Sequence, residues 1–182
     1  MHYEVCFCPH CATELQPITL AEDGGDKERL RCPACGWTHW NNPTPVLAAI
    51  VEIDGKVLLA RNAAWPGKMF ALITGFMEAG ESPQEGIARE VKEETNLDIV
   101  SPRLVGFKQF FDKLDRRYLV FFYRADQFSG SLHASREGKL EWVKISDLPK
   151  RQLAYNFDRD LEVFLKNDLD EHVLLDKKDF LY

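Results

Sequence analysis

Residues 75–97 read GFMEAGESPQEGIAREVKEETNL, and this stretch decides the fold of the chain. Ser82 is a good N-cap for a helix, Pro83 suits the first helical position, and Glu85 completes a capping box. Asn96 can adopt the left-handed backbone conformation that ends a helix. The pattern therefore predicts a helix that begins at Pro83 and ends just before Asn96.

Three carboxylates of this helix fall on one side of it. On a wheel at 100° per residue, Glu90, Glu93 and Glu94 span an arc of about 100°. Hard carboxylate oxygens without a thiol or imidazole suit Mg²⁺ or Mn²⁺, which proteins often hold together with substrate phosphates. Arg89 is adjacent and can orient one carboxylate, and Gly86 has no side chain to crowd a ligand. A solvated acidic face is the alternative that this pattern leaves open.

The composition is that of a soluble globular chain. Its 182 residues are 45% hydrophobic and 29% charged, which suits one domain, or one domain with a small appendage. The longest apolar runs, such as residues 46–51, are too short to span a bilayer. The first ten residues lack the basic and apolar regions of a secretory signal. We therefore expect a cytoplasmic protein that does not act at a membrane.

The charge balance argues against a nucleic-acid partner. The chain has a formal net charge of −6, and its first 40 residues carry three basic and six acidic side chains. Nucleic-acid affinity depends on neutralising phosphates, and a nucleic-acid-binding module normally carries a basic surface. A phosphorylated small molecule remains a suitable ligand, because a bound divalent cation reverses the local charge.

Four of the five cysteines form two CxxC pairs. Cys8 and Cys11 are separated from Cys32 and Cys35 by 20 residues, the sequence form of a tetrahedral zinc site. Two disulfides are an alternative that needs an oxidising compartment. A redox-active CxxC is another, although a single motif beside a βαβ pattern would be expected. We predict Zn²⁺ bound by the four thiolates, with Cys6 as a spare thiol.

The segment Asn41-Asn-Pro-Thr-Pro45 follows the cysteines and indicates a domain boundary, because its residues favour loops. We therefore place a small β-rich zinc ribbon, with a hairpin tip at residues 21–27, in residues 1–42, and a second domain in residues 43–182. The second domain opens with a predicted hairpin that turns at Asp54-Gly55. Other elements are expected later: strands at 70–74 and 119–123, and a helix from Asn156 or Asp158 with Leu161, Phe164 and Leu165 facing the core.

The helical segment resembles the Nudix box, the signature of the Nudix hydrolases. It reads Gly75, five residues, Glu81, seven residues, Arg89-Glu90-Val91-Lys92-Glu93-Glu94, one residue, then Asn96-Leu97. The family has Gly where this chain has Asn96, and Asn is one of the residues most tolerant of the left-handed conformation. The resemblance extends from about Pro45 to the C-terminus. The N-terminal ribbon is similar to that of NADH pyrophosphatases and of ribbon-bearing FAD pyrophosphatase-like proteins.

The resemblance implies an α/β fold, an α/β/α sandwich with a mixed sheet, and Mg²⁺-dependent hydrolysis of a nucleoside diphosphate linked to another group. Many family members are homodimers, so the resemblance also implies a homodimer. The metal-binding positions carried over from the box are Glu90, Glu93 and Glu94, with help from the Gly75 carbonyl. The catalytic set is Glu90, Arg89 and Glu93: Glu90 matches the position often assigned as general base, and Arg89 would orient the carboxylates.

Two further carboxylates complete the expected metal site. Glu81 would support the loop or bind an outer metal ion. A carboxylate outside the box often contributes in this family, and Glu137 is our choice, with Glu141 interpreted as a surface residue.

The substrate is predicted less directly. The downstream serine-glutamine-proline-tryptophan-proline-phenylalanine-proline motif of NADH pyrophosphatases is absent, and residues 105–111 read VGFKQFF instead. Phe107 and Phe110, with Phe111 and Tyr118, can supply a stacking wall for a base, although alternating burial in a strand explains them equally well. Arg116 can reach a phosphate or lie at a hairpin tip.

We expect a small nucleotide substrate, either a dinucleotide cofactor such as NADH or FAD, or ADP-ribose. Hydrolysis of damaged nucleoside triphosphates is an alternative within the enzyme class. A nucleotide-sensing regulator built on the same fold is the alternative outside it. Sensors can lose acidic residues of the box, whereas this chain keeps Glu81, Glu90, Glu93 and Glu94, so the sequence favours an enzyme.

Overall fold

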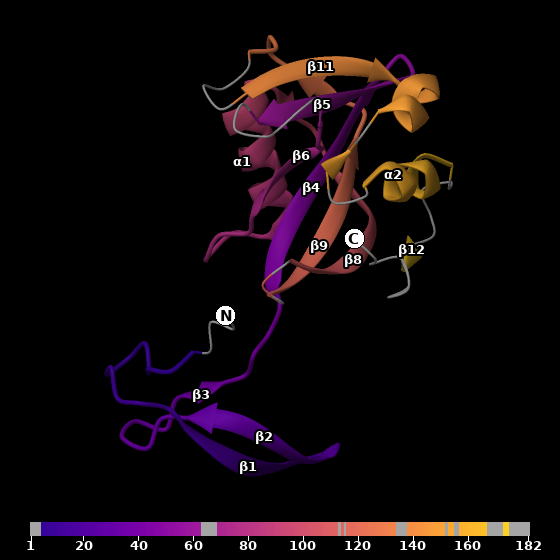
Figure 1. Ribbon diagram of the computed structural model, residues 1–182. Coiled ribbons are helices and arrows are strands. Elements are labelled where there is room, and N and C mark those ends of the chain that lie inside the picture. The colour runs from indigo at the N-terminus through magenta and orange to yellow at the C-terminus, as the bar shows by residue number, and fades with distance from the viewer. Residues whose placement is uncertain are drawn as a thin grey trace. The chain divides into compact units, whose positions relative to one another are not determined.

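A computed structural model describes residues 5–62, 69–112, 114, 116–133, 138–151, 153–154, 157–166 and 173–174. The chain divides into two compact units (Figure 1). The first consists of residues 1–43 together with Phe111–Arg117, and the second of Thr44–Phe110 and Tyr118–Tyr182.

The first unit contains a three-stranded antiparallel sheet. Its strands, in the order β1-β2-β3, are Gln16–Glu22, Gly25–Arg31 and Thr38–His39. The hairpin turn between β1 and β2 lies where the sequence predicts it. Its buried core is small: Leu15 packs with Cys8 and Cys32, and Leu30 and Trp37 cover them. A unit of about 40 residues usually needs a metal or disulfides to be stable, so this core fits the predicted ribbon.

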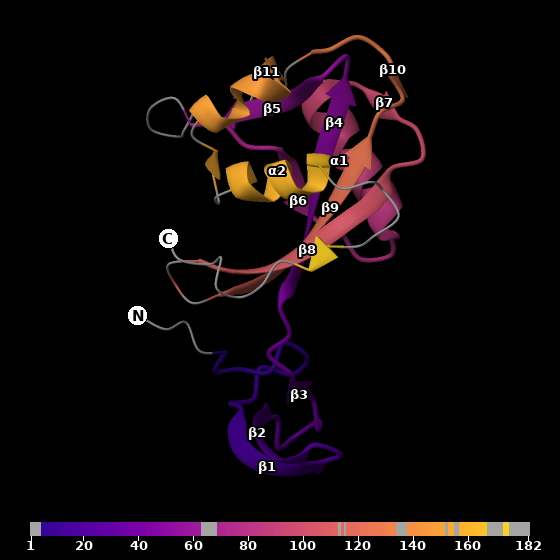
Figure 2. The same ribbon diagram turned by 90° about the vertical axis from the view of Figure 1, so that its right-hand side faces the viewer.

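The second unit is built on a mixed seven-stranded sheet (Figures 1 and 2). Its strands, in chain order, are β4 (Thr44–Ile53), β5 (Lys56–Asn62), β6 (Ile73–Phe76), β8 (Arg103–Phe111), β9 (Arg117–Ala125), β11 (Gly138–Lys144) and β12 (Val173–Leu174). The order is β11-β5-β4-β9-β8-β12, and β6 also pairs with β4. Two short strands, β7 (Asp98–Ile99) and β10 (Phe128–Ser129), form a separate pair.

Strand β4 organises this sheet. Asp54 and Gly55 form the predicted two-residue turn, both with positive φ, at 49° and 68°. Strand β5 pairs with β4 only next to the turn, and then continues beside β11. Strand β6 pairs antiparallel with residues Val46 to Ala49 of β4. Strand β9 runs parallel to β4 on the other side. The strand expected at 70–74 is thus found slightly later, as β6.

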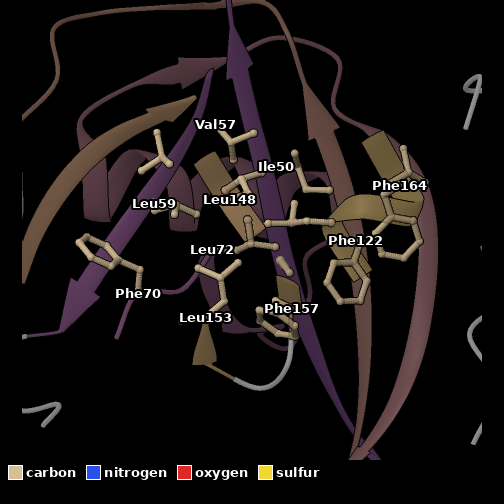
Figure 3. Packing of buried hydrophobic residues seen from close by; sticks show 14 of the residues in the cluster. Ile50, Val57, Leu59, Phe70, Leu72, Phe122, Leu148, Leu153, Phe157 and Phe164 are labelled. Atoms are coloured by element: carbon tan, nitrogen blue, oxygen red, sulfur yellow. The ribbon is translucent and has the colours of Figure 1, made fainter. Parts of the chain in front are cut away.

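One helix covers each face of the sheet, so the predicted α/β/α sandwich is confirmed (Figure 1). Helix α1 (Pro83–Thr95) packs Ile87 and Val91 into one buried cluster. Helix α2 (Phe157–Lys166) packs the predicted core residues Leu161 and Phe164 into the other. Figure 3 shows this second cluster, in which Phe122 lies against Phe157 and Phe164, with ring centroids 5.3 and 4.8 Å apart. A short 3₁₀ helix, η1 (Ile145–Lys150), adds Leu148 to it.

Helix α1 begins and ends where the sequence predicts. The Ser82 hydroxyl accepts from the Glu85 N–H at 3.3 Å, and the Glu85 carboxylate accepts from the Ser82 N–H at 2.7 Å, which completes the capping box. Asn96 ends the helix with φ 62° and donates its N–H to the Lys92 carbonyl. In the described part of the chain, neither this helix nor any other is both long and apolar enough for a bilayer span.

Candidate functional site

The Arg89 side chain is the centre of the site on α1. Its Nε and Nη2 donate to the two oxygens of Glu81 at 3.0 and 2.9 Å. Its Nη1 donates to Glu90 at 2.7 Å and to Glu93 at 3.3 Å, and Nη2 also donates to the Phe76 carbonyl at 3.1 Å. These five bonds, here called the Arg89 network, use all five N–H donors of the guanidinium. The structure thus brings Arg89 to three of the predicted carboxylates.

Glu81 is held as an anion within this network. Besides the two bonds from Arg89, one of its oxygens accepts from the Glu78 N–H at 2.7 Å. These hydrogen bonds, chiefly those from Arg89, lower the pKa of Glu81 to about 2. Glu81 is therefore ionised across the physiological range, and it fixes the guanidinium from one side.

Glu90 lies in a different environment. Its side chain is only 13% exposed, and this burial raises the pKa of its carboxyl, while the Arg89 guanidinium opposes the rise. The carboxylate rests on the backbone of β6 at Gly75. A Cβ at Gly75 would lie 1.9 Å from Glu90 Cδ, so no other residue fits there without moving Glu90. Gly75 therefore has a steric role in addition to the predicted one for its carbonyl.

The sequence suggests that Gly86 leaves space for a ligand, but the structure shows that other side chains fill this space. It is buried, and a Cβ there would lie 2.5 Å from Glu81 Oε1 and 2.6 Å from Leu47 Cδ1. The missing side chain instead allows Glu81 and β4 to approach α1. The wheel placed Gly86 on the correct side of the helix but could not show that other side chains occupy that side.

The remaining box carboxylates are more accessible. The Glu93 side chain is 60% exposed, and Glu94 is partly exposed. In the part of the chain that the structure describes, the only group of three or more His, Cys, Asp or Glu side chains placed to hold one metal ion is the four cysteines, whose sulfurs lie within 4.8 Å of one another. Glu90, Glu93 and Glu94 do not converge to that degree. Their fit to Mg²⁺ rests on hard oxygen donors on one helix side and on the Gly75 surface that seats Glu90.

Two carboxylates outside the box were considered from sequence. Glu137 lies outside the described residues, so its predicted role stays a prediction. Glu141, interpreted from sequence as a surface residue, is partly buried on β11 and accepts from Arg151 Nη2 at 2.5 Å. The Arg151 guanidinium in turn lies over the Phe70 ring, 5.3 Å from its centroid. Glu141 thus belongs to a structural ion pair.

The predicted aromatic wall is divided between the two faces of the sheet. Phe107 packs with Phe121, 6.5 Å between ring centroids, and Phe121 packs against the buried cluster on the α1 face. Phe110 packs with Tyr118 at 5.9 Å and against the cluster on the α2 face. The two phenylalanines therefore cannot form one stacking surface. Arg116 lies in the β8–β9 connection, where its guanidinium pairs with Asp112 at 2.6 Å, in keeping with the hairpin-tip interpretation.

Phe76 is a candidate residue that the sequence reasoning missed. Its side chain is 55% exposed, its ring lies 6.4 Å from that of Tyr118, and its carbonyl accepts from Arg89. The backbone of Phe76 thus belongs to the Arg89 network, whereas its ring lies with Tyr118 on the α2 face of the sheet, opposite to the face that carries α1. Its position directly after Gly75 in the box is the one signal in the sequence that could have identified it.

The four cysteines of the first unit form a compact sulfur cluster. The Cys8–Cys35 and Cys11–Cys32 Sγ pairs are 3.5 Å apart, and the Cys11–Cys35 pair is 3.7 Å apart. Four sulfurs about 2.3 Å from a tetrahedral zinc ion would be spaced by about 3.8 Å. The donor set and its spacing therefore fit zinc.

Comparison with known proteins matches both units. A family model described as the NUDIX domain matches residues 42–163, and one described as Nudix N-terminal, a zinc ribbon, matches residues 6–41. The NAD-capped RNA hydrolase NudC of Pseudomonas aeruginosa is 28% identical over 147 residues, which are 79% of this chain and 49% of NudC. An uncharacterized Nudix hydrolase, YvcI of Bacillus subtilis, is 31% identical over 66% of this chain and 78% of its own length.

Solved structures agree on the fold. The crystal structure of a NUDIX hydrolase from Nitrosomonas europaea has a TM-score of 0.66 over 94% of this chain and 99% of that chain, at 24% identity. A MutT protein from Bacillus halodurans has a TM-score of 0.63 at 28% identity, over 72% of this chain and 88% of that chain. The chain spans about half the length of NudC. Since the NUDIX-domain match covers most of its length, the chain belongs to the Nudix hydrolase family and carries that family's N-terminal zinc ribbon.

Proposed function

We propose that this protein hydrolyses a pyrophosphate bond in a nucleoside-diphosphate-linked substrate, with Mg²⁺ or Mn²⁺ as cofactor. The observation that carries the proposal is the Arg89 network, in which one guanidinium holds Glu81 and Glu90 on the same side of α1. Family membership supports the reaction class. The intact set of box carboxylates favours an enzyme over a nucleotide sensor.

The carboxylates and Arg89 have different roles in this proposal. Glu90, Glu93 and Glu94 would hold the metal ions, with the Gly75 carbonyl. When bound, such ions neutralise the pyrophosphate and lower the pKa of a coordinated water. Glu81 stays anionic and keeps Arg89 in place, and Arg89 orients Glu90. Because Glu90 is largely buried, it accepts a proton more readily than an exposed glutamate, which suits a general base.

For the substrate we propose a dinucleotide cofactor such as NADH or FAD, or ADP-ribose. The relatives named NAD-capped RNA hydrolase support this choice, because their name points to a nicotinamide dinucleotide end. Their name also makes NAD-capped RNA a substrate to be tested, against our expectation from the net charge of −6.

A second candidate is the hydrolysis of damaged nucleoside triphosphates. It is favoured by the likeness to the MutT protein of Bacillus halodurans, at 28% identity. We further propose that Cys8, Cys11, Cys32 and Cys35 bind a structural Zn²⁺. Cytoplasmic location and a homodimer stay predictions.

The test is a substrate panel with Mg²⁺ in which products are identified by mass. It contains NADH, FAD, ADP-ribose, NAD-capped RNA and the nucleoside triphosphates. We expect two monophosphates from a dinucleotide, formed only when Mg²⁺ or Mn²⁺ is present, because the proposed ions neutralise the pyrophosphate. Efficient cleavage of triphosphates alone would overturn the substrate proposal and leave the metal site standing. Tight nucleotide binding without turnover of any panel member would overturn the enzyme proposal.

A further inference from the structure

The two cysteines of each CxxC pair differ in exposure. Cys8 and Cys32, the first of each pair, are 2% and 1% exposed. Cys11 and Cys35, the second of each pair, are exposed. A small oxidant dissolved in water therefore reaches the sulfur atoms of only one cysteine from each pair. Those two sulfurs, Cys11 Sγ and Cys35 Sγ, are 3.7 Å apart.

Backbone hydrogen bonds do not distinguish the two kinds of cysteine. The His10 N–H donates to Cys8 Sγ at 3.4 Å, and the Cys35 N–H donates to Cys32 Sγ at 3.5 Å. The exposed Cys11 and Cys35 sulfurs also have backbone hydrogen bonds, with Thr13 and Trp37. Exposure therefore decides which sulfurs a dissolved oxidant reaches.

From this asymmetry we propose that Cys11 and Cys35 form a peroxide-sensitive modification site in the zinc-loaded ribbon. The first thiolate attacks the O–O bond of hydrogen peroxide, becomes a sulfenic acid and releases hydroxide. The second thiolate attacks that sulfur, forms the S–S bond and displaces a second hydroxide. The two sulfurs give up two electrons, the peroxide gains them, and two protons from solvent convert the hydroxides to water.

Disulfide formation removes half of the zinc ligands. The S–S bond is about 2.05 Å long, so the two sulfurs must approach by roughly 1.7 Å from their separation of 3.7 Å. Only Cys8 and Cys32 then remain for the metal, where a structural site needs four ligands. Zinc should therefore leave as the disulfide forms. This inference rests on the proposed zinc and is independent of the substrate.

The experiment treats the zinc-loaded full chain with hydrogen peroxide and follows zinc release with a chromogenic chelator. Trypsin then separates residues 1–27, which contain Cys11, from residues 32–56, which contain Cys35. We expect one zinc released per disulfide formed, the two peptides joined, and fragmentation spectra that place the link between Cys11 and Cys35. A reductant with added zinc should restore the bound metal.

Cys6→Ser is the matched control, because Cys6 is also exposed but belongs to neither pair. This variant should release zinc and form the link as the parent does. A disulfide within either peptide, or a link that contains Cys6, would overturn the proposal. Zinc that stays bound at peroxide levels that fully oxidise Cys6 would overturn it too. A chain that binds no zinc before oxidant is added would contradict the zinc site itself, and so is distinguishable.

Discussion

At the scale of single residues, Arg89 is the side chain on which the site depends most. Every N–H donor of its guanidinium is used, and its partners lie on α1, on the preceding loop and on the backbone of β6. A lysine has the same charge but cannot reproduce the planar fork of five donors. The geometry of Arg89, and not only its charge, therefore sets the positions of Glu81 and Glu90.

Arg89→Lys should accordingly lower turnover by roughly 10–100-fold, the range for residues that orient metal ligands. The Mg²⁺ concentration needed for half-maximal activity should rise as well, because the Arg89 guanidinium no longer orients Glu90. Metal titrations of kcat would measure both effects. Arg116→Lys is the control, since Arg116 pairs with Asp112 in the β8–β9 connection, and it should leave both values nearly unchanged. Parental kinetics in Arg89→Lys would contradict the role assigned to the guanidinium.

Gly75→Ala tests whether the position of the Glu90 carboxylate against the Gly75 backbone matters for activity. The new Cβ would lie 1.9 Å from Glu90 Cδ, so the carboxylate must leave its position. We expect turnover to fall much further than thermal stability, as measured by steady-state kinetics and circular dichroism melting. Gly24→Ala is the control, because its Cβ would meet only the end of the flexible Lys27 side chain, at 3.9 Å. Equal activity losses in the two variants would argue against a specific role of Gly75.

At the scale of elements, α1 combines a stable scaffold with a charged outer side. Its apolar residues Ile87 and Val91 are fully buried, and its termini are capped by local hydrogen bonds. Such a helix can carry several like charges without unfolding. The carboxylates can therefore be replaced one at a time to separate chemistry from stability.

Glu93→Gln and Glu94→Gln should each reduce turnover by orders of magnitude, because each removes charge from the proposed metal site. Folding should change little, and relief of like-charge repulsion can even stabilise the helix slightly. Kinetics and urea unfolding of the same preparations would check this. Glu85→Gln is the control, since Glu85 serves the capping box and should leave the chemistry largely intact. Near-normal activity in both metal-site variants would refute the assignment.

The capping box should also give α1 a measurable pH dependence. The Ser82 N–H lowers the pKa of Glu85 in the folded state. A depressed folded pKa contributes stability that is present above the unfolded value, about 4.3, and is lost as pH falls through the folded pKa. The free energy of unfolding should therefore differ between the parent and Glu85→Gln at neutral pH, and less in acid. Ser82→Ala should cost ~1 kcal/mol at neutral pH. A parent–variant difference that grows in acid would contradict this account.

At the scale of the whole molecule, the ribbon and the Nudix domain differ in what stabilises them. The Nudix domain has two large buried clusters, one on each face of its sheet. In its described residues the ribbon has one small cluster, which includes Cys8 and Cys32. The first unit should therefore depend on metal far more than the second.

The purified protein should carry close to one zinc per chain, measured by elemental analysis. Cys32→Ser should lose the metal and make residues 1–40 sensitive to proteases, because a structural zinc site contributes directly to folding. The closed shell of four thiolates leaves no position for water or substrate, so the zinc itself should take no part in hydrolysis. A metal-free preparation with a protease-resistant ribbon would disprove the prediction.

The sequence by itself determined the features that rest on local contacts. The bounds of α1 follow from a capping box and an Asn cap that lie within a few residues of one another, and the β4–β5 turn follows from Asp54-Gly55. The four cysteines proposed to bind zinc stand out as two CxxC motifs. The deciding hydrogen bonds, and the two sulfur donors of each motif, come from neighbours in the chain, so their spacing is readable without the fold.

Only the tertiary structure decided what depends on distant partners. Strand β6 takes the place of β5 beside the first half of β4, Arg89 bonds to the Phe76 carbonyl, and Glu141 pairs with Arg151. Each of these contacts joins residues ten or more positions apart, which local spacing does not reveal. The aromatic wall failed for a related reason. Side chains alternate along a strand, so Phe107 and Phe110 point to opposite faces, and which helix covers each face is set by the packing of the whole sheet.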